Sequence, residues 1–257
     1  MGLSIAMKIN FPLLALAVGA FTIGTTEFSP MGFLPEIAND LSVSIPQAGL
    51  LISAYAVGVM IGAPLMTLWL ARFPKKTALI LLMAIFTIGH VLANVAPDYM
   101  SLMGARLITS LNHGAFFGLG SVVAASVVPK DKQASAVAMM FMGLTIANIG
   151  GVPLATWLSQ NTSWRMAFAV ISILGIITML ALWKALPQDH DVVKPNVAKE
   201  LRVLTRAPVV LALLTTVMSA GAMFALYTYI APSLHVFMQA SPQTITLMLV
   251  LIGIGFS

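Results

Sequence analysis

The chain has 257 residues, of which 59% are hydrophobic and only 8% are charged, and its mean hydropathy is +0.98. A water-soluble domain carries roughly 25% charged residues because its surface faces water, so this composition excludes cytosolic enzymes and secreted scaffolds and indicates that lipid is the main solvent. The net charge of +5 comes from scattered basic residues that form no nucleic-acid-binding stripe, and the absence of cysteine removes disulfides, thiolate nucleophiles and cysteine metal sites.

Seven apolar stretches are long enough to cross a bilayer, which takes roughly 20 residues of helix. An eighth stretch begins near residue 243 and reaches the last residue, Ser257. Their length and their lack of strand-like alternation favour helices over strands. The sequence therefore predicts an all-α, polytopic membrane protein. The seven stretches are residues 11–34, 46–70, 77–97, 99–127, 135–158, 165–186 and 209–231.

The longest polar stretch divides the chain into three parts. We expect an N-terminal six-helix bundle at residues 1–186, a cytoplasmic linker at 187–208 and an incomplete second bundle at 209–257. Basic residues recur in the linker at helical spacing, which favours an amphipathic helix at the membrane interface, although a solvated basic linker fits the same pattern. At the other end, Met7 is an alternative start to Met1.

The basic residues predict the orientation. With the N-terminus placed inside, eleven of the thirteen fall on the cytoplasmic side, as the positive-inside rule requires. The two exceptions are Arg106, within the fourth span, and Arg165, at the outer start of the sixth, while the outer loops carry Glu36, Asp40 and Asp98. The eleven residues are Lys8, Arg72, Lys75, Lys76, Lys130, Lys132, Lys184, Lys194, Lys199, Arg202 and Arg206.

Two ionisable side chains lie at membrane depth, where insertion costs at least about 2.5–3.5 kcal/mol. Glu27 is in the first span and Arg106 in the fourth, each about 10 Å below the outer boundary at 1.5 Å per residue. Equal depth permits an ion pair that forms and breaks as Glu27 loses and gains a proton, which would couple protons to a cargo. The alternative is a fixed bridge that holds two helices together.

One face of the fourth span is polar. Helical periodicity places Thr109, Ser110, His113 and Phe117 on the same side as Arg106, as in the wall of a wet cavity. His113 is near mid-membrane and is of a residue type that titrates near neutral pH. A buried histidine with one interhelical hydrogen bond is the structural alternative.

Enzymatic and metal-binding signatures are absent from the sequence: it contains no HExxH, GxSxG or P-loop motif and no carboxylate cluster with metal-ligand spacing. We therefore expect no enzymatic activity, no catalytic residue, no metal and no cofactor. An intramembrane enzyme or electron carrier is the weaker alternative, because it would need such groups.

The loop between spans two and three, Thr67–Lys76, resembles the G-x-L-A-D-R-x-G-R-K signature of the major facilitator superfamily. Arg72, Lys75 and Lys76 match its basic positions, while Ala71 replaces the aspartate. In addition, Arg106 is similar to the fourth-span arginine of that family, and the Trp164-Arg165 pair is similar to its W-R-x-x-F opening of span six. Residues Gly143 through Pro153 of the fifth span resemble the glycine/proline motif of the exporter branch. Asn148, Gly150, Gly151 and Pro153, which lie in this segment, are expected to bend or loosen the helix.

This resemblance to proton-coupled drug and sugar exporters implies a twelve-span antiporter of two six-helix halves in the bacterial inner membrane. It implies alternating access, a proton-coupling role for Glu27 and Arg106, and a conformational role for the loop and fifth-span motifs. Expected partners are protons, membrane lipid and a small molecule such as a sugar, drug or related metabolite, with no nucleic acid and with a monomeric full-length protein. The chain would then supply the first half, the linker, span seven and part of span eight; a truncated fragment without transport is the alternative.

Overall fold

The computed structural model describes residues 10–188 and 205–255. Seven helices or helix series in these ranges are long and apolar enough to cross a membrane, and a shorter apolar helix follows them. The described part of the chain contains no strand, so the all-α prediction is confirmed. The expected linker helix and the choice between Met1 and Met7 lie outside the described residues.

The helices follow the predicted spans closely. Most breaks fall at turn residues or caps that satisfy free backbone amides: Asn10 caps the first helix, Ser44 and Asp98 form capping boxes, and Ser163 caps the sixth span. The helices are α1 Phe11–Gly32, α2 Leu34–Asp40, α3 Ile45–Leu70, α4 Lys75–Asn94, α5 Tyr99–Ser110, α6 His113–Ser126, η1 Lys130–Lys132, α7 Gln133–Ile146, η2 Ala147–Gly151, α8 Val152–Asn161, α9 Trp164–Ala185, α11 Ala207–Thr228, α12 Ile230–Met238 and α13 Pro242–Gly255.

Two spans are interrupted inside the bundle. The fourth span breaks at Leu111 and Asn112, so α5 ends just before His113 opens α6. The fifth span contains η2, a π-helical turn at Ala147–Gly151, which confirms the expectation that its glycine-rich motif loosens the helix. Broken helices leave backbone groups that need other partners, and within membranes they are tolerated where protein or a polar cavity surrounds them.

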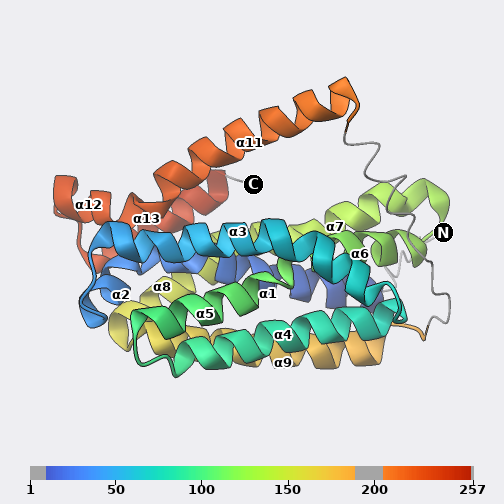
Figure 1. The fold of residues 1–257 in the computed structure, drawn as a ribbon, viewed down its shortest axis with the longest axis horizontal. Coiled ribbons are helices and arrows are strands. Elements are labelled where there is room, and N and C mark those ends of the chain that lie inside the picture. The colour runs from blue at the N-terminus through green and yellow to red at the C-terminus, as the bar shows by residue number, and fades with distance from the viewer. Residues whose placement is uncertain (1–9, 189–204, 256–257) are drawn as a thin grey trace, which may run out of the picture.

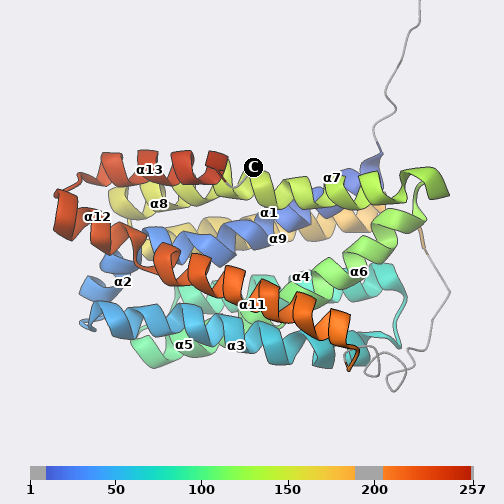
Figure 2. The same ribbon diagram turned by 90° about the horizontal axis from the view of Figure 1, so that it is seen from above.

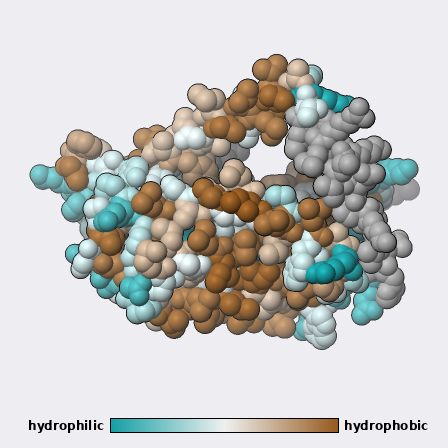
Figure 3. All heavy atoms as spheres, in the orientation of Figure 1, coloured by the Kyte–Doolittle hydropathy of each residue, from teal (hydrophilic) through white to brown (hydrophobic). Residues whose placement is uncertain are grey.

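The six N-terminal spans form one bundle around a continuous apolar core (Figures 1 and 2), in which α1 packs against α7 and α9, and α4 lies along α9. Large side chains such as Leu16, Phe86, Phe116 and Phe168 are completely buried there. Other large apolar side chains point outward, and hydrophobic residues cover the middle of the bundle while hydrophilic ones gather near its ends (Figure 3). Such a surface suits a lipid environment.

Glycines set the closest helix contacts. A Cβ on Gly143 of α7 would meet the backbone of α1 at Ala17 and Phe21, and Gly58 of α3 lies directly against Ser110. Gly114 is in tight contact with Ala63, whereas nothing lies within 4 Å of the Cβ position of Gly118. Of these two glycines, Gly114 alone allows close packing against a neighbouring helix.

The helices that follow the linker contact the N-terminal bundle mainly at one end. In Figure 1, α11 diverges from the bundle towards its own N-terminus, and its buried residues are the last two, Tyr227 and Thr228. Near that end Phe28 stacks on Phe224 at 5.4 Å between ring centroids and meets the edge of Tyr227 at 5.7 Å. The end that carries α2 and α12 is thus closed, and the opposite end of α11 is apart from the bundle.

Candidate functional site

Glu27 faces His113 across the inside of the N-terminal bundle. The His113 Nε2 atom lies 3.8 Å from the Glu27 carboxylate, and the two side chains keep 14% and 17% of their surface exposed. The direct ion pair that equal depth permits between Glu27 and Arg106 is not formed in this structure, in which Glu27 pairs with His113. Equal depth was therefore not sufficient for contact, because depth along a helix does not determine the direction in which its side chain points.

Arg106 is held by other groups. Its guanidinium lies over the ring of Tyr55, 4.2 Å from the centroid, and its Nη1 donates a hydrogen bond of 3.1 Å to the Thr26 hydroxyl. The side chain is 1% exposed, and within the described residues its Nε and Nη2 atoms have no hydrogen-bond partner. A buried cation with free donors is costly, so Arg106 is balanced by the face of an aromatic ring and by the more distant Glu27 carboxylate.

A short hydrogen-bond chain fixes the position of Arg106. The Nδ1 atom of His90 lies 2.9 Å from the Phe86 carbonyl, to which it donates, so its Nε2 accepts from the Thr26 hydroxyl at 2.5 Å. Thr26 in turn accepts from Arg106. All three side chains are buried, and the His90 Nδ1, Thr26 hydroxyl and Arg106 Nη1 donors each have an acceptor. His90 therefore stabilises the position of Arg106 through Thr26, and its side chain does not face an open surface.

His113 stands at the break in the fourth span. Its Nδ1 atom lies 3.0 Å from the Tyr55 hydroxyl, and its ring packs 5.1 Å from that of Phe117, which stacks on Phe141. The structure thus brings together Glu27, His113 and Phe117 from the predicted set. Tyr55 lies outside that set, although a tyrosine inside a glycine-containing span was a signal for it.

Thr109 and Ser110 occupy a different environment. Both are fully buried, and their hydroxyls donate to carbonyls of their own helix, those of Ala105 and Leu107. Thr109 packs against Gly89 of α4, and Ser110 against Gly58 of α3. In this conformation the two side chains contribute to helix packing, whereas His113 and Phe117 are partly exposed.

The basic loop between α3 and α4 makes its contacts within the N-terminal bundle. The guanidinium of Arg72 lies 5.2 Å from the centroid of the Trp69 ring and 5.5 Å from that of Phe73. Lys76 donates a 2.8 Å hydrogen bond from Nζ to the carbonyl of Leu186, the residue that ends α9. Lysine at a helix C-terminus neutralises free carbonyls. Lys75 is the first residue of α4.

The fifth-span motif lies between α1 and α13. Asn148 donates to the Leu144 carbonyl at 3.2 Å, and its backbone is in tight contact with Gly253 of α13. Gly151 packs against Thr25 of α1, whereas nothing lies within 4 Å of a Cβ at Gly150. Pro153 is the second residue of α8, directly after the π-helical turn. This motif therefore contacts helices of both halves.

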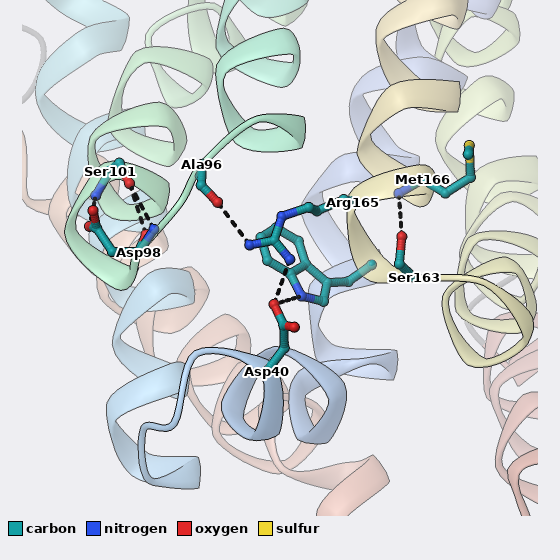
Figure 4. Close-up of polar contacts among 8 residues, drawn as sticks. Asp40, Ala96, Asp98, Ser101, Ser163, Arg165 and Met166 are labelled. Atoms are coloured by element: carbon teal, nitrogen blue, oxygen red, sulfur yellow. Dashed lines mark hydrogen bonds and ion pairs between the residues drawn. The ribbon is translucent and has the colours of Figure 1, made fainter.

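Asp40, the last residue of α2, joins three segments of the N-terminal bundle (Figure 4). Its carboxylate accepts hydrogen bonds from Arg165 Nη1 at 2.5 Å and from Trp164 Nε1 at 3.0 Å, while Arg165 also donates to the Ala96 carbonyl at 2.9 Å. The hydrogen bond from Arg165 is the main cause that lowers the pKa of Asp40 below its usual range.

We expect Asp40→Asn to destabilise the protein by about 1 kcal/mol or less, because the pair is partly exposed to solvent. A carboxyl with a lowered folded-state pKa contributes its stability above the ordinary value of about 4, and that contribution is lost as pH falls through the folded-state pKa. Thermal unfolding in detergent should separate the variant from the wild type at neutral pH, and the difference should disappear in strong acid. A difference that persists in acid would contradict this electrostatic origin.

Metal binding has no visible basis in the described residues, which contain no group of three or more histidine and acidic side chains placed to hold an ion.

The helices are apolar and of membrane length, and Glu27, Arg106, His90 and His113 lie between them. These features are typical of a polytopic membrane transporter. Residues 16–257 match the Major Facilitator Superfamily, and the chain belongs to this family.

Curated relatives narrow the comparison. The chain is 66% identical over 251 residues to the inner membrane transport protein YdhP of Escherichia coli (strain K12), and this match covers 98% of the chain and 64% of that protein. It is 35% identical to the putative transporter AraJ of the same strain, with 95% and 62% covered. A probable sugar efflux transporter of Helicobacter pylori (strain P12) is 30% identical, with 93% and 61% covered. The chain therefore spans less than two thirds of the length of these relatives.

Solved structures agree on the fold. A bacterial homologue of the human lysosomal transporter Spinster, in an inward-facing and unoccupied conformation, aligns with a TM-score of 0.76 at 18% identity, covering 95% of this chain and 58% of that one. A D-xylose–proton symporter aligns with a TM-score of 0.68 at 15% identity, covering 94% and 65%.

Proposed function

We propose that this chain forms the N-terminal half, and the beginning of the C-terminal half, of an exporter that exchanges protons for a small molecule across the bacterial inner membrane. The observation that carries the proposal is the contact between Glu27 and His113, two titratable side chains that meet at membrane depth and remain partly exposed. The names of the relatives, an inner membrane transport protein and a probable sugar efflux transporter, support the membrane and the direction of transport.

Glu27 is suited to carry a proton because an ionised carboxylate is energetically costly at membrane depth. The long-range attraction of Arg106 favours the ionised carboxylate, whereas the apolar surroundings favour the protonated acid. A cargo that enters the same polar region alters this balance, so proton release and cargo binding become linked. His113 and Phe117 form the wall on which we place the cargo, with Thr109 and Ser110 behind them.

The arrangement of the two halves supports an alternating-access cycle. The basic residues indicate that the N-terminus lies on the cytoplasmic side. In that orientation the closed end, near Phe28 and Tyr227, faces outward, and the end at which α11 diverges from the bundle faces the cytoplasm. We infer an inward-facing state in which the fifth-span motif and the basic loop act during closure of the cytoplasmic side. We place the working protein in the membrane as a monomer.

The test requires a transporter of full family length that carries this chain. The protein is reconstituted into liposomes that contain a pH-sensitive dye, and sugars, amino acids and cationic drugs are applied singly under an imposed pH gradient. Coupled export predicts that at least one compound drives a proton flux in the opposite direction. Transport of a compound without any proton flux would refute the antiport mechanism, and the absence of transport for every compound would refute the exporter assignment.

A further inference from the structure

We infer that Tyr55 is a positioning residue that couples the charge of Arg106 to the Glu27–His113 pair by controlling which ring nitrogen of His113 carries the proton. This inference rests on the proposed function, because it deepens the account of the same site. It does not concern the identity of the cargo.

The geometry places Tyr55 between the two groups. Its hydroxyl lies 3.0 Å from His113 Nδ1, on the side of the imidazole opposite Nε2, which faces Glu27. Its ring lies under the Arg106 guanidinium at 4.2 Å and meets the His113 ring edge-on at 5.9 Å between centroids. The side chain is 4% exposed. Arg106 thus reaches His113, the partner of Glu27, through the Tyr55 side chain rather than by direct contact.

A neutral imidazole has one donor nitrogen and one acceptor nitrogen. When Glu27 is ionised, its carboxylate needs a donor, so the proton of His113 belongs on Nε2 and the Tyr55 hydroxyl donates into Nδ1. When Glu27 is protonated, its O–H can donate to Nε2, and then Nδ1–H donates to the Tyr55 oxygen. A hydroxyl serves both states because it can donate or accept.

Arg106 biases this choice. A cation over an aromatic face is attracted to the ring electrons, and it withdraws electron density from the phenol, which makes the hydroxyl a better donor and a poorer acceptor. The state with Nε2–H facing an ionised Glu27 is therefore favoured. The remaining titratable group packed against this cluster is His90 on α4, and its two nitrogens are already engaged with Thr26 and Phe86.

The test measures the protonation of the histidine rings directly. The chain is labelled with ¹⁵N-histidine in detergent micelles, and the signals of His113 and His90 are assigned with His113→Asn and His90→Asn. In the wild type at alkaline pH we expect a single His113 tautomer with the proton on Nε2. In Tyr55→Phe, which retains the ring under Arg106 but removes the hydroxyl, we expect a mixture of both tautomers, with His90 unchanged.

Tyr99→Phe is the matched control, because it removes a tyrosine hydroxyl that donates to the Gln47 carbonyl far from this cluster, and it should leave His113 unchanged. A wild-type proton on Nδ1 at alkaline pH, or an unaltered His113 signal in folded Tyr55→Phe, would overturn the inference. The wild-type measurement decides the matter even where the variant fails to fold. Because this readout requires no transport, it can succeed while the liposome test of proton exchange fails, and the reverse.

Discussion

Glu27→Gln is expected to reduce proton-driven export to the level of empty liposomes while the protein still inserts and folds. Glutamine has nearly the same shape as glutamate and can still contact His113, but it cannot release a proton. A transport cycle that requires release of the Glu27 proton would stop in one state, and the pH gradient would no longer accelerate transport. The measurement is the initial rate of cargo export with and without an imposed pH gradient, in a full-length transporter that carries this chain.

Glu36→Gln provides the control, since it makes the same chemical change in α2, outside the membrane span, and should retain the response to pH. Yield, thermal stability and the helical circular dichroism signal of both variants should match the wild type. If Glu27→Gln still responds fully to the pH gradient, then Glu27 is not the coupling group and its contact with His113 is structural. Loss of function accompanied by loss of folding in Glu27→Gln alone would support a structural role for the Glu27–His113 contact.

That Glu27 and Arg106 are candidate site residues was predictable from the sequence, because charge at membrane depth always needs an explanation. Their relationship to each other was not. The rotation of each helix determines the partner of a side chain, and here it points Arg106 at Tyr55 and Thr26. The fourth span also breaks at Leu111 and Asn112, between Thr109 and His113. A periodicity of 100° per residue runs through such a break without detecting it.

The spans themselves were predictable to within three residues at their ends, since composition and turn chemistry determine where a helix can enter and leave lipid. The interior contacts depend on tertiary structure. Gly114 and Gly118 are identical in the sequence pattern, yet α3 approaches the first alone. Likewise, Gly150 and Gly151 are adjacent and belong to one motif, but Gly151 is the one that packs against α1. Glycine spacing shows where a helix can be approached closely, and it does not show whether a neighbour is there.

Gly143 gives the largest expected effect on stability. A Cβ at this position would lie 2.8 Å from the backbone nitrogen of Phe21 and even closer to the carbonyl oxygen of Ala17. These are backbone atoms of α1, the most buried of the spans, so no side chain can rotate away and two whole helices must separate. Overpacking of a well-packed interior typically costs about 1–3 kcal/mol, and we expect Gly143→Ala to reach or exceed the upper part of that range.

Gly118→Ala is the matched control in the neighbouring span. It adds the same methyl group where nothing lies within 4 Å, and alanine is favoured over glycine inside a helix by roughly 0.5–1 kcal/mol, so this variant should be slightly more stable than the wild type. Unfolding of both variants in mixed micelles should therefore shift in opposite directions. If Gly143→Ala proves as stable as Gly118→Ala, then α1 and α7 can move apart at little cost. The close packing of the fifth span on the first would then not be what holds the coupling site in place.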